Sequence, residues 1–305
     1  MELVEAIILS VLAASTPLLI AATGELVTER SGVLNLGVEG MMIMGAACGF
    51  AGAWLSGSVI IGALCGIIAG VSMSLIFAMM TLGLAVNQVA TGLALTILGI
   101  GLSGLIGAGF VGERIQPAPH LYIPLLTNIP LIGRIVFGED AFVYLSIALI
   151  VGVSWFLYRT RAGLVLRACG DNHISAHALG YPVLRIRLLA VMFGGACAGL
   201  AGAYLPLAYT PFFIPGMTAG RGWIALALVV FASWLPGRLV IGAYLFGAVS
   251  ILQLHAQGAG IGIPSQFMSA LPYLATVIVL VLLSRGRTGG STAPAALGTV
   301  FVPDR

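Results

Sequence analysis

The most polar stretch of this chain is residues 159–187, which read RTRAGLVLRACGDNHISAHALGYPVLRIR. Long apolar segments flank it on both sides. The hydrocarbon core of a bilayer is about 30 Å thick, and a helix needs about 20 apolar residues to cross it. A polar insert between two such segments must therefore lie in water, and arginine-rich short loops face the cytoplasm. The arginines of this loop fix the orientation of the chain: Arg159, Arg161, Arg167, Arg185 and Arg187.

The overall composition agrees with a membrane protein. The chain has 305 residues, of which 60% are hydrophobic and only 8% are charged, and its mean hydropathy is +1.12. A soluble domain carries about 25% charged residues. All of the basic residues are arginines, and they are too dispersed along the sequence to form a nucleic-acid surface.

About nine segments, within a range of eight to ten, are apolar and long enough to span a bilayer. They are 3–22, 32–55, 58–80, 86–110, 140–158, 187–209, 221–235, 237–256 and 264–284. The sequence therefore predicts an all-α polytopic membrane protein in which residues 1–285 form a single transmembrane domain. The tail 286–305 is rich in Gly, Ser, Thr, Ala and Pro, so we expect it to be cytoplasmic and poorly ordered.

Successive spans cross the membrane in opposite directions. If loop 159–187 is cytoplasmic, the nine spans therefore place the N-terminus outside and the C-terminus in the cytoplasm. Ten arginines then fall on the cytoplasmic side, against only Arg114, Arg134 and Arg221 on the outer side. This ratio agrees with the positive-inside rule. The longest outer loop, 111–139, contains four prolines, which predict irregular structure.

Two stretches of the chain echo each other. Residues 45–55 read GAACGFAGAWL and residues 195–205 read GACAGLAGAYL. A duplicated half of the chain would explain the echo. Tightly packed membrane helices also converge on small residues, and the sequence leaves both explanations open.

The entrance to the second span, residues 24–40, is unusually polar and contains several glycines, which weaken regular helix. Asn35 and Glu39 are four residues apart and so share a helix face. A carboxylate or a broken helix at membrane depth normally lines a cavity or is buried in protein. One interpretation places both side chains in the solute pathway. The other is a structural hydrogen-bond network, with Glu39 paired to Arg30.

Asn87 and Gln88, at the start of the fourth span, raise the same question. They either bond a polar solute or cap and interlock helices, and we count them with Asn35 and Glu39 as candidate pathway residues. Aromatic residues near the predicted interfaces are expected mainly in the interfacial belt, although one in the pathway would stack on a flat solute. These residues are Phe212, Phe213, Trp223, Trp234 and Tyr273.

The cytoplasmic loop contains its own helix signals. Asp171 or Asn172 is placed to cap a short helix over 173–179, and Gly180 is placed to end it. A short amphipathic helix in a basic loop suits insertion into a groove of another protein. The alternative is a helix that lies on the membrane surface.

Motifs for catalysis are absent from the sequence. It has no phosphate-binding G-x-x-x-x-G-K-[ST] loop, no H-E-x-x-H and no G-x-S-x-G. The four cysteines form no C-x-x-C pair, and no histidine lies at metal-ligand spacing. We therefore expect no catalytic residue, no metal site and no cofactor in this chain.

Two motifs of the sequence resemble those of a known protein family. Residues 29–42, ERSGVLNLGVEGMM, and residues 170–180, GDNHISAHALG, resemble the permease subunits of bacterial ABC importers of the ribose and branched-chain amino-acid group. The more specific similarity is to the nucleoside-type branch, whose binding proteins are basic membrane lipoproteins. The match extends along most of the chain.

The resemblance implies an import permease in the bacterial cytoplasmic (inner) membrane that works by alternating access. Its cargo would be a nucleoside-like neutral solute; riboflavin, a simple sugar or a branched-chain amino acid are alternatives. Its partners would be an ABC ATPase that binds ATP and Mg, a second permease chain (identical or related), an extracytoplasmic lipoprotein and membrane lipid, with no nucleic acid. The loop helix would couple to the ATPase through Gly170, Asp171, Asn172, Ser175, Ala176, Leu179 and Gly180.

A different class of protein competes with this interpretation. An ion-driven secondary transporter would use Glu39 as its coupling carboxylate. The scarcity of other ionisable residues in the spans argues against it.

Overall fold

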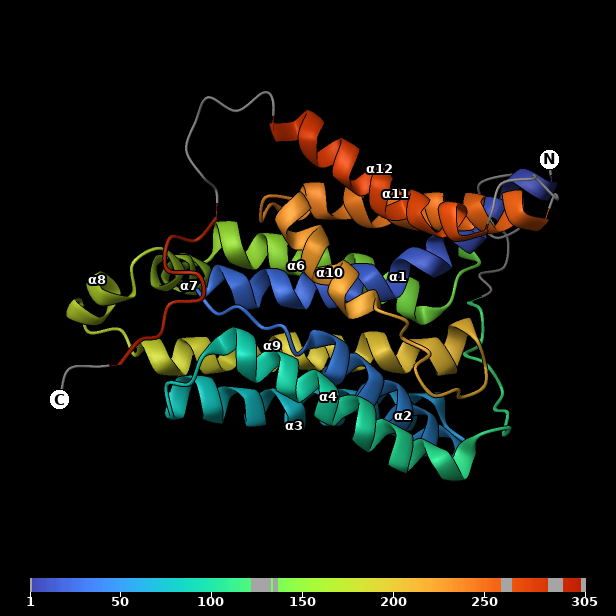
Figure 1. Cartoon of the computed structure of the whole chain (residues 1–305), viewed down its shortest axis with the longest axis horizontal. Coiled ribbons are helices and arrows are strands. Elements are labelled where there is room, and N and C mark those ends of the chain that lie inside the picture. Colours follow the sequence, from blue (N-terminus) through green and yellow to red (C-terminus); the bar gives the residue numbers. More distant parts are fainter. Residues whose placement is uncertain (1, 122–132, 134–136, 259–264, 285–292, 303–305) are drawn as a thin grey trace.

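The computed structural model describes residues 2–121, 133, 137–258, 265–284 and 293–302, and these are mainly helical (Figure 1). The first half contains α1 (Glu2–Arg30), α2 (Val38–Ser56), α3 (Val59–Ala78), the π-helical turn η1 (Met79–Gly83), α4 (Gln88–Gly107) and the 3₁₀ turn η2 (Ala108–Phe110). The second half contains α6 (Ala141–Arg159), α7 (Arg161–Asp171), α8 (His173–Ala178), α9 (Val183–Tyr204), the π-helical turn η3 (Leu205–Tyr209), α10 (Arg221–Phe231), α11 (Pro236–Gly258) and α12 (Ser265–Ser284).

Seven helical segments in the described part of the chain are long and apolar enough to cross a membrane. They are Val4–Arg30, Val38–Ser56, Val59–Gly83, Gln88–Phe110, Ala141–Arg159, Val183–Tyr209 and Pro236–Gly258. The protein is therefore a polytopic α-helical membrane protein, as predicted. The first helix is longer than the predicted span 3–22, because its polar last turns, with Glu25 and Glu29, are buried in the bundle and stay helical.

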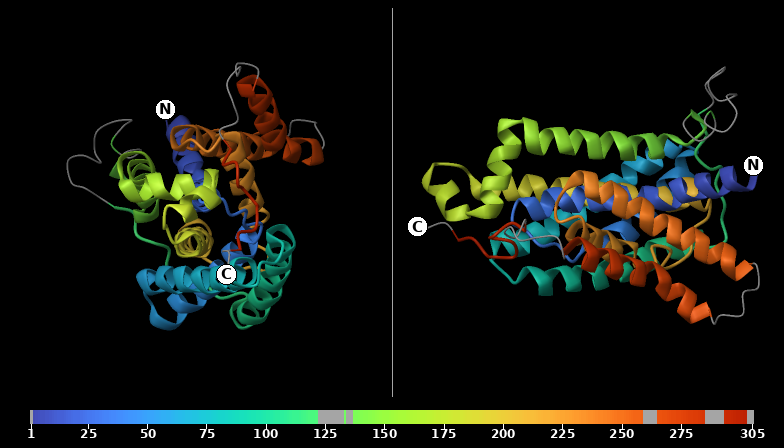
Figure 2. Two further views of the ribbon diagram at one scale, coloured as in Figure 1. Left: turned by 90° about the vertical axis from the view of Figure 1, so that its left-hand side faces the viewer. Right: turned by 90° about the horizontal axis from the view of Figure 1, so that it is seen from above.

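The long helices run roughly along one axis of the molecule (Figures 1 and 2). The start of α1 lies at one end of this axis. The short helices α7 and α8 and the described tail residues 293–302 lie at the other end. Helix α9 packs against α1, α2 and α3, and α12 lies beyond α11 at the edge of the bundle.

Backbone-to-backbone contacts hold α2, α3 and α9 together. A Cβ atom added to Gly45 of α2 would lie 2.2 Å from the carbonyl oxygen of Gly199 in α9, and one added to Gly70 of α3 would lie 2.1 Å from that of Gly195. The echoing stretches 45–55 and 195–205 thus pack on each other. Small residues let membrane helices approach this closely, and these contacts support the packing explanation of the shared pattern.

Two helices begin halfway along the bundle. The first turn of α2 packs on the middle of α4, since a Cβ on Gly40 would lie 2.7 Å from the backbone of Thr96. The first turn of α10 meets the first turn of α2, since a Cβ on Gly222 would lie 2.6 Å from the backbone of Glu39. Non-helical segments lead into each: 31–37 comes from the α7–α8 end, and 210–220 from the opposite end (Figure 1).

Part of the C-terminal tail returns to the bundle. Residues 293–302 are packed against the bundle, with Ala296 and Phe301 buried, and the predicted poor order of the tail stays a prediction. The remainder of the predicted tail, 286–292 and 303–305, lies outside the described residues.

Candidate functional site

The non-helical segment 31–37 is held by polar side chains from two helices, α1 and α4. The backbone N–H of Leu34 donates to the Gln88 side chain at 2.8 Å, and that of Asn35 donates to the Glu25 carboxylate at 3.3 Å. The hydroxyl of Thr96 donates to the Leu36 carbonyl at 3.1 Å. Irregular backbone at membrane depth is tolerated only where its polar groups find partners inside the protein. These side chains supply those partners.

Glu39 links α2 and α10, the two helices that begin halfway along the bundle and that we call the broken helices. Its Oε1 accepts from the Thr218 hydroxyl at 2.6 Å and from the Gly220 N–H at 3.0 Å, and its Oε2 accepts from the Gly222 N–H at 2.6 Å. The carboxylate thus caps the N-terminus of α10, where free N–H groups and the helix dipole favour a negative charge. Arg30, the partner considered from the sequence, donates instead to the Trp234 carbonyl at 2.8 Å.

The four predicted pathway residues all make hydrogen bonds that hold the fold. The side-chain oxygen of Asn35 accepts from the Gly37 N–H at 3.0 Å, and that of Asn87 accepts from the Ala90 N–H at 3.0 Å and caps α4. Asn35, Glu39 and Gln88 are buried. None of the four is among the lining residues of the three cavities described below. Their contacts favour the structural interpretation, while their role in the pathway stays a prediction.

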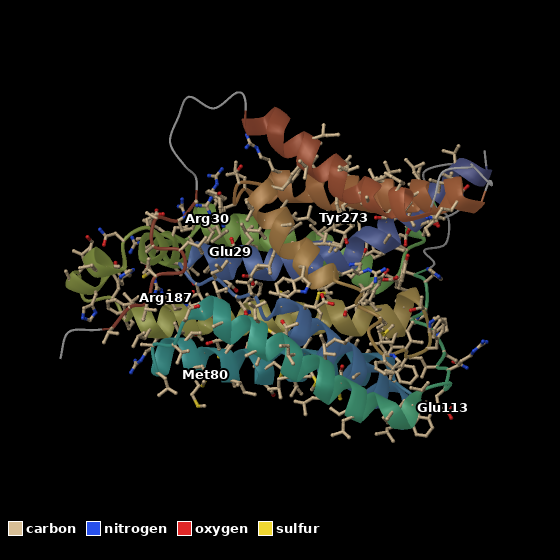
Figure 3. All side chains as sticks on the ribbon, viewed as in Figure 1. Glu29, Arg30, Met80, Glu113, Arg187 and Tyr273 are labelled. Carbon is tan, nitrogen blue, oxygen red and sulfur yellow. The ribbon has the colours of Figure 1, made fainter. Side chains whose placement is uncertain are left out.

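A cavity of about 360 Å³, lined by both polar and apolar residues, lies beside the start of α10. Tyr209, Arg221, Ser250, Gln253 and Tyr273 contribute its polar atoms, and no carboxylate is among the described lining residues. The Arg221 guanidinium lies 5.8 Å from the centre of the Tyr209 ring and donates to the Met217 carbonyl at 3.0 Å. Figure 3 shows Tyr273 over the middle of the bundle. We call this space the inner cavity.

A second cavity of about 560 Å³ adjoins the inner cavity, since Tyr209 and Ile251 line both. Its lining includes His120, Glu139 and Tyr204. Burial and, to a smaller extent, the charge of neighbouring Asp140 raise the pKa of Glu139 to about 7. We call this space the outer cavity, because it lies toward the end of the bundle that holds the start of α1.

A third cavity, of about 690 Å³, has a different character. It lies between α1, α6, α7 and α9, and its lining is apolar, with residues such as Val27, Leu149 and Phe193. A polar solute would find no hydrogen-bond partners from these side chains. The space suits a lipid tail, and the inner and outer cavities, whose linings include polar side chains, are the better candidates for solute.

The loop helix predicted over 173–179 is present as α8. Asn172 caps it, because its side-chain oxygen accepts from the Ser175 N–H at 2.9 Å, and Gly180 adopts φ +87° just after the helix. Ile174 and Leu179 are 70% and 78% exposed. The additional helix α7 precedes it, capped by Thr160. The end of the bundle thus presents a short helix with exposed apolar side chains.

Two residues named from the sequence lie in places that it did not predict. Arg187, a loop arginine, is fully buried (Figure 3). Trp234 is buried too, and its indole donates a hydrogen bond to Glu29 rather than lying in an interfacial belt. The sequence did contain one indication of this pairing. Glu25 and Glu29 are four residues apart and share one face of α1, so two carboxyl groups in an apolar segment need buried partners. The sequence could not identify those partners, because Glu29 and Trp234 are 205 positions apart and meet only in the folded protein.

A helical bundle with two helices broken at mid-depth, and a cavity partly lined by polar side chains beside one break, has the architecture of a membrane transport protein. A family model described as the branched-chain amino acid transport system / permease component matches residues 7–288. The chain belongs to that family.

Relatives of the chain are permease proteins. It is 42% identical to the putative glucose ABC transporter permease protein TsgC13 of Haloferax volcanii over 88% of each chain. It is 30% identical to the nucleoside ABC transporter permease protein NupC of Lactococcus lactis, covering 98% of this chain and 97% of the relative. It is 29% identical to the guanosine ABC transporter permease protein NupQ of Bacillus subtilis, covering 99% and 98%.

These similarities define the class of protein. The chain is an ABC transporter permease, a transport subunit and not an enzyme. Membership of this family implies an ABC ATPase and a solute-binding protein as partners.

Proposed function

We propose that the chain is the permease subunit of an ATP-driven importer for a nucleoside-like neutral solute. The observation that carries the proposal is the match to nucleoside and guanosine permeases along nearly the full length of both chains. The inner cavity supports it, since aromatic rings can stack on a base while hydroxyl, amide and guanidinium groups bond a ribose. Its lack of a described carboxylate suits a neutral solute.

The proposed orientation has the N-terminus outside and the C-terminus in the cytoplasm, with about nine crossings of the cytoplasmic membrane. Seven long helices, the 210–220 segment with α10, and α12 together support that number. The arginine-rich α7–α8 end supports the cytoplasmic assignment. The outer cavity then opens toward the side from which solute arrives.

The proposed power source is a separate ABC ATPase that binds ATP and Mg and receives the loop helix α8. The coupling residues remain those predicted: Gly170, Asp171, Asn172, Ser175, Ala176, Leu179 and Gly180. The exposure of Ile174 and Leu179 supports a docking role, because isolated apolar side chains on a polar loop gain from burial in a partner's groove. A second permease chain and an extracytoplasmic lipoprotein complete the proposed importer.

The mechanism is alternating access. Solute released at the outer cavity moves past Tyr209, which both cavities share, into the inner cavity. Closure of the ATPase displaces α8. The broken helices α2 and α10, joined through Glu39, then rearrange around the inner cavity so that it opens to the cytoplasm.

The experiment is uptake by the complete importer in proteoliposomes, with labelled guanosine as the probe. We expect uptake that needs ATP and the partner ATPase. Tyr209→Ala and Tyr273→Ala should raise the KM for guanosine by about tenfold, since stacking on a base contributes about 1–3 kcal/mol. Tyr158→Ala, which removes an exposed tyrosine outside both cavities, is the control. Uptake driven by an imposed proton gradient through this chain alone would contradict the proposal.

A sugar is the second candidate solute. The 42% identity to a putative glucose permease favours it. Glucose tested in the same proteoliposomes distinguishes the two, because saturable ATP-dependent glucose uptake without guanosine uptake would assign the sugar.

A further inference from the structure

The described C-terminal tail joins two parts of the protein that are distant in sequence. The N–H of Ala296 donates to the Gly170 carbonyl, at the end of α7, at 2.9 Å. The N–H of Gly298 donates to the Gly32 carbonyl, in the segment that leads into α2, at 3.1 Å. Residues 293–302 thus bridge the loop that carries α8 and the break between α1 and α2.

Phe301 anchors the end of this tail against α8. Its ring centre lies 5.1 Å from that of His173 and 5.3 Å from that of His177, edge to face in both cases. Phe301 is only 8% exposed and packs in a small cluster with Cys169, Ala176 and Val183. The tail therefore covers one face of α8, and the face with Ile174 and Leu179 stays open.

Arg187 lies at the junction of the three segments. Its Nε donates to the Ser31 carbonyl at 3.1 Å, its Nη1 donates to the Thr299 carbonyl at 3.2 Å, and its Nη2 lies 3.3 Å from Nδ1 of His173. Gly32 leaves room for it, since a Cβ there would lie 2.8 Å from Nη2. One planar, permanently charged group with several fixed donors suits such a three-way junction.

We propose that residues 293–302 form a strap that couples motion of α8 to the broken helix α2, with Phe301 and Arg187 as positioning residues. The inference rests on the proposed function for the role of α8. Segment 31–37 leads directly to Glu39, whose carboxylate caps α10, and α10 borders the inner cavity. A displacement of α8 therefore moves the wall of the inner cavity through this series of hydrogen-bonded contacts.

The test is Phe301→Ala in the complete importer, with Val302→Ala as the control, since Val302 is the next residue and 65% exposed. The readouts are co-purification of the ATPase, ATP hydrolysis, and guanosine transported per ATP hydrolysed. We expect Phe301→Ala to keep the ATPase bound and active while transport per ATP falls on the order of tenfold, as a lost coupling between sites does. Val302→Ala should match the wild type.

Hydrogen exchange on the same complexes tests the strap independently of transport. In Phe301→Ala, exchange should increase both in α8 and in 31–37. An increase confined to α8 would overturn the proposal even if the wild type transported no guanosine. Absence of ATP-dependent uptake by the wild type would count against the proposed function alone.

Gly298→Ala supplies a milder variant should Phe301→Ala fail to assemble. Gly298 adopts φ +74°, where an L side chain costs about 1–2 kcal/mol, and the substitution leaves α8 intact. We expect the same loss of transport per ATP to a smaller degree. Transport per ATP equal to or above the wild type in an assembled strap variant would overturn the proposal, and a rise would indicate an inhibitory tail instead.

Discussion

At the scale of single residues, polar groups inside the bundle serve the backbone. Gln88, Thr96 and Glu25 form hydrogen bonds with the non-helical segment 31–37, and Glu39 caps α10. The sequence pointed to Asn35, Glu39 and Gln88 as special, because polar residues are costly in a membrane span. It left open whether a solute or the protein satisfies them, since side-chain partners depend on which helices are adjacent.

Glu39→Gln separates these two roles. The amide cannot accept from both Gly220 and Gly222 as the carboxylate does, and leaving a buried N–H unsatisfied costs about 1–3 kcal/mol. We expect a lower melting temperature of the purified complex, with Glu113→Gln on the exposed outer surface as the control. Unchanged stability combined with lost transport would instead indicate contact with solute.

Glu139 gives a prediction about pH. Its pKa is about 7 in the folded protein against 4.5 for the free side chain, mainly because of burial. The folded state therefore binds the proton more tightly, and the wild type loses stability as pH rises from about 4.5 through 7. Glu139→Gln cannot ionise, so its melting temperature should exceed that of the wild type at pH 8 and equal it at pH 4. A difference that does not change with pH would contradict the assignment.

At the scale of elements, the hydropathy of the chain predicts the helices closely. The predicted spans 140–158 and 237–256 correspond to α6 and α11 within a few residues. The predicted span 32–55 begins with the non-helical residues 32–37 before α2 starts at Val38, and 221–235 contains the short α10. Hydropathy reports the length of an apolar segment but not where its helix breaks, because tertiary partners decide which backbone groups can leave the helix.

Helix packing offers a matched pair of glycine substitutions. Gly45→Ala would place a Cβ 2.2 Å from the Gly199 carbonyl oxygen, and overpacking of this kind costs about 1–3 kcal/mol. Gly101→Ala, on the open face of α4, meets nothing within 4 Å. We expect a lower melting temperature for Gly45→Ala alone. Equal stability of the two variants would show that α2 and α9 are not packed this closely.

At the scale of the whole molecule, the orientation is open to a labelling experiment. In a variant without native cysteines, Leu179→Cys in the exposed part of the α8 loop should react with a membrane-impermeant maleimide only after cells are opened. Val111→Cys, at the other end of the bundle and also exposed, should react in intact cells. The reverse pattern would invert the proposed topology and remove the docking role of α8.

The sequence alone determined the class of this protein: a polytopic helical permease with an arginine-rich loop, a capped loop helix and no catalytic motif. Those features are local, since hydropathy, capping residues and loop charge act over a few turns of chain. Only the tertiary structure decided that Glu39 caps α10, that 45–55 packs on 195–205, and that residues 293–302 return to α8. These are pairings between distant segments, and a buried polar group finds its partner only when folding brings the two segments together.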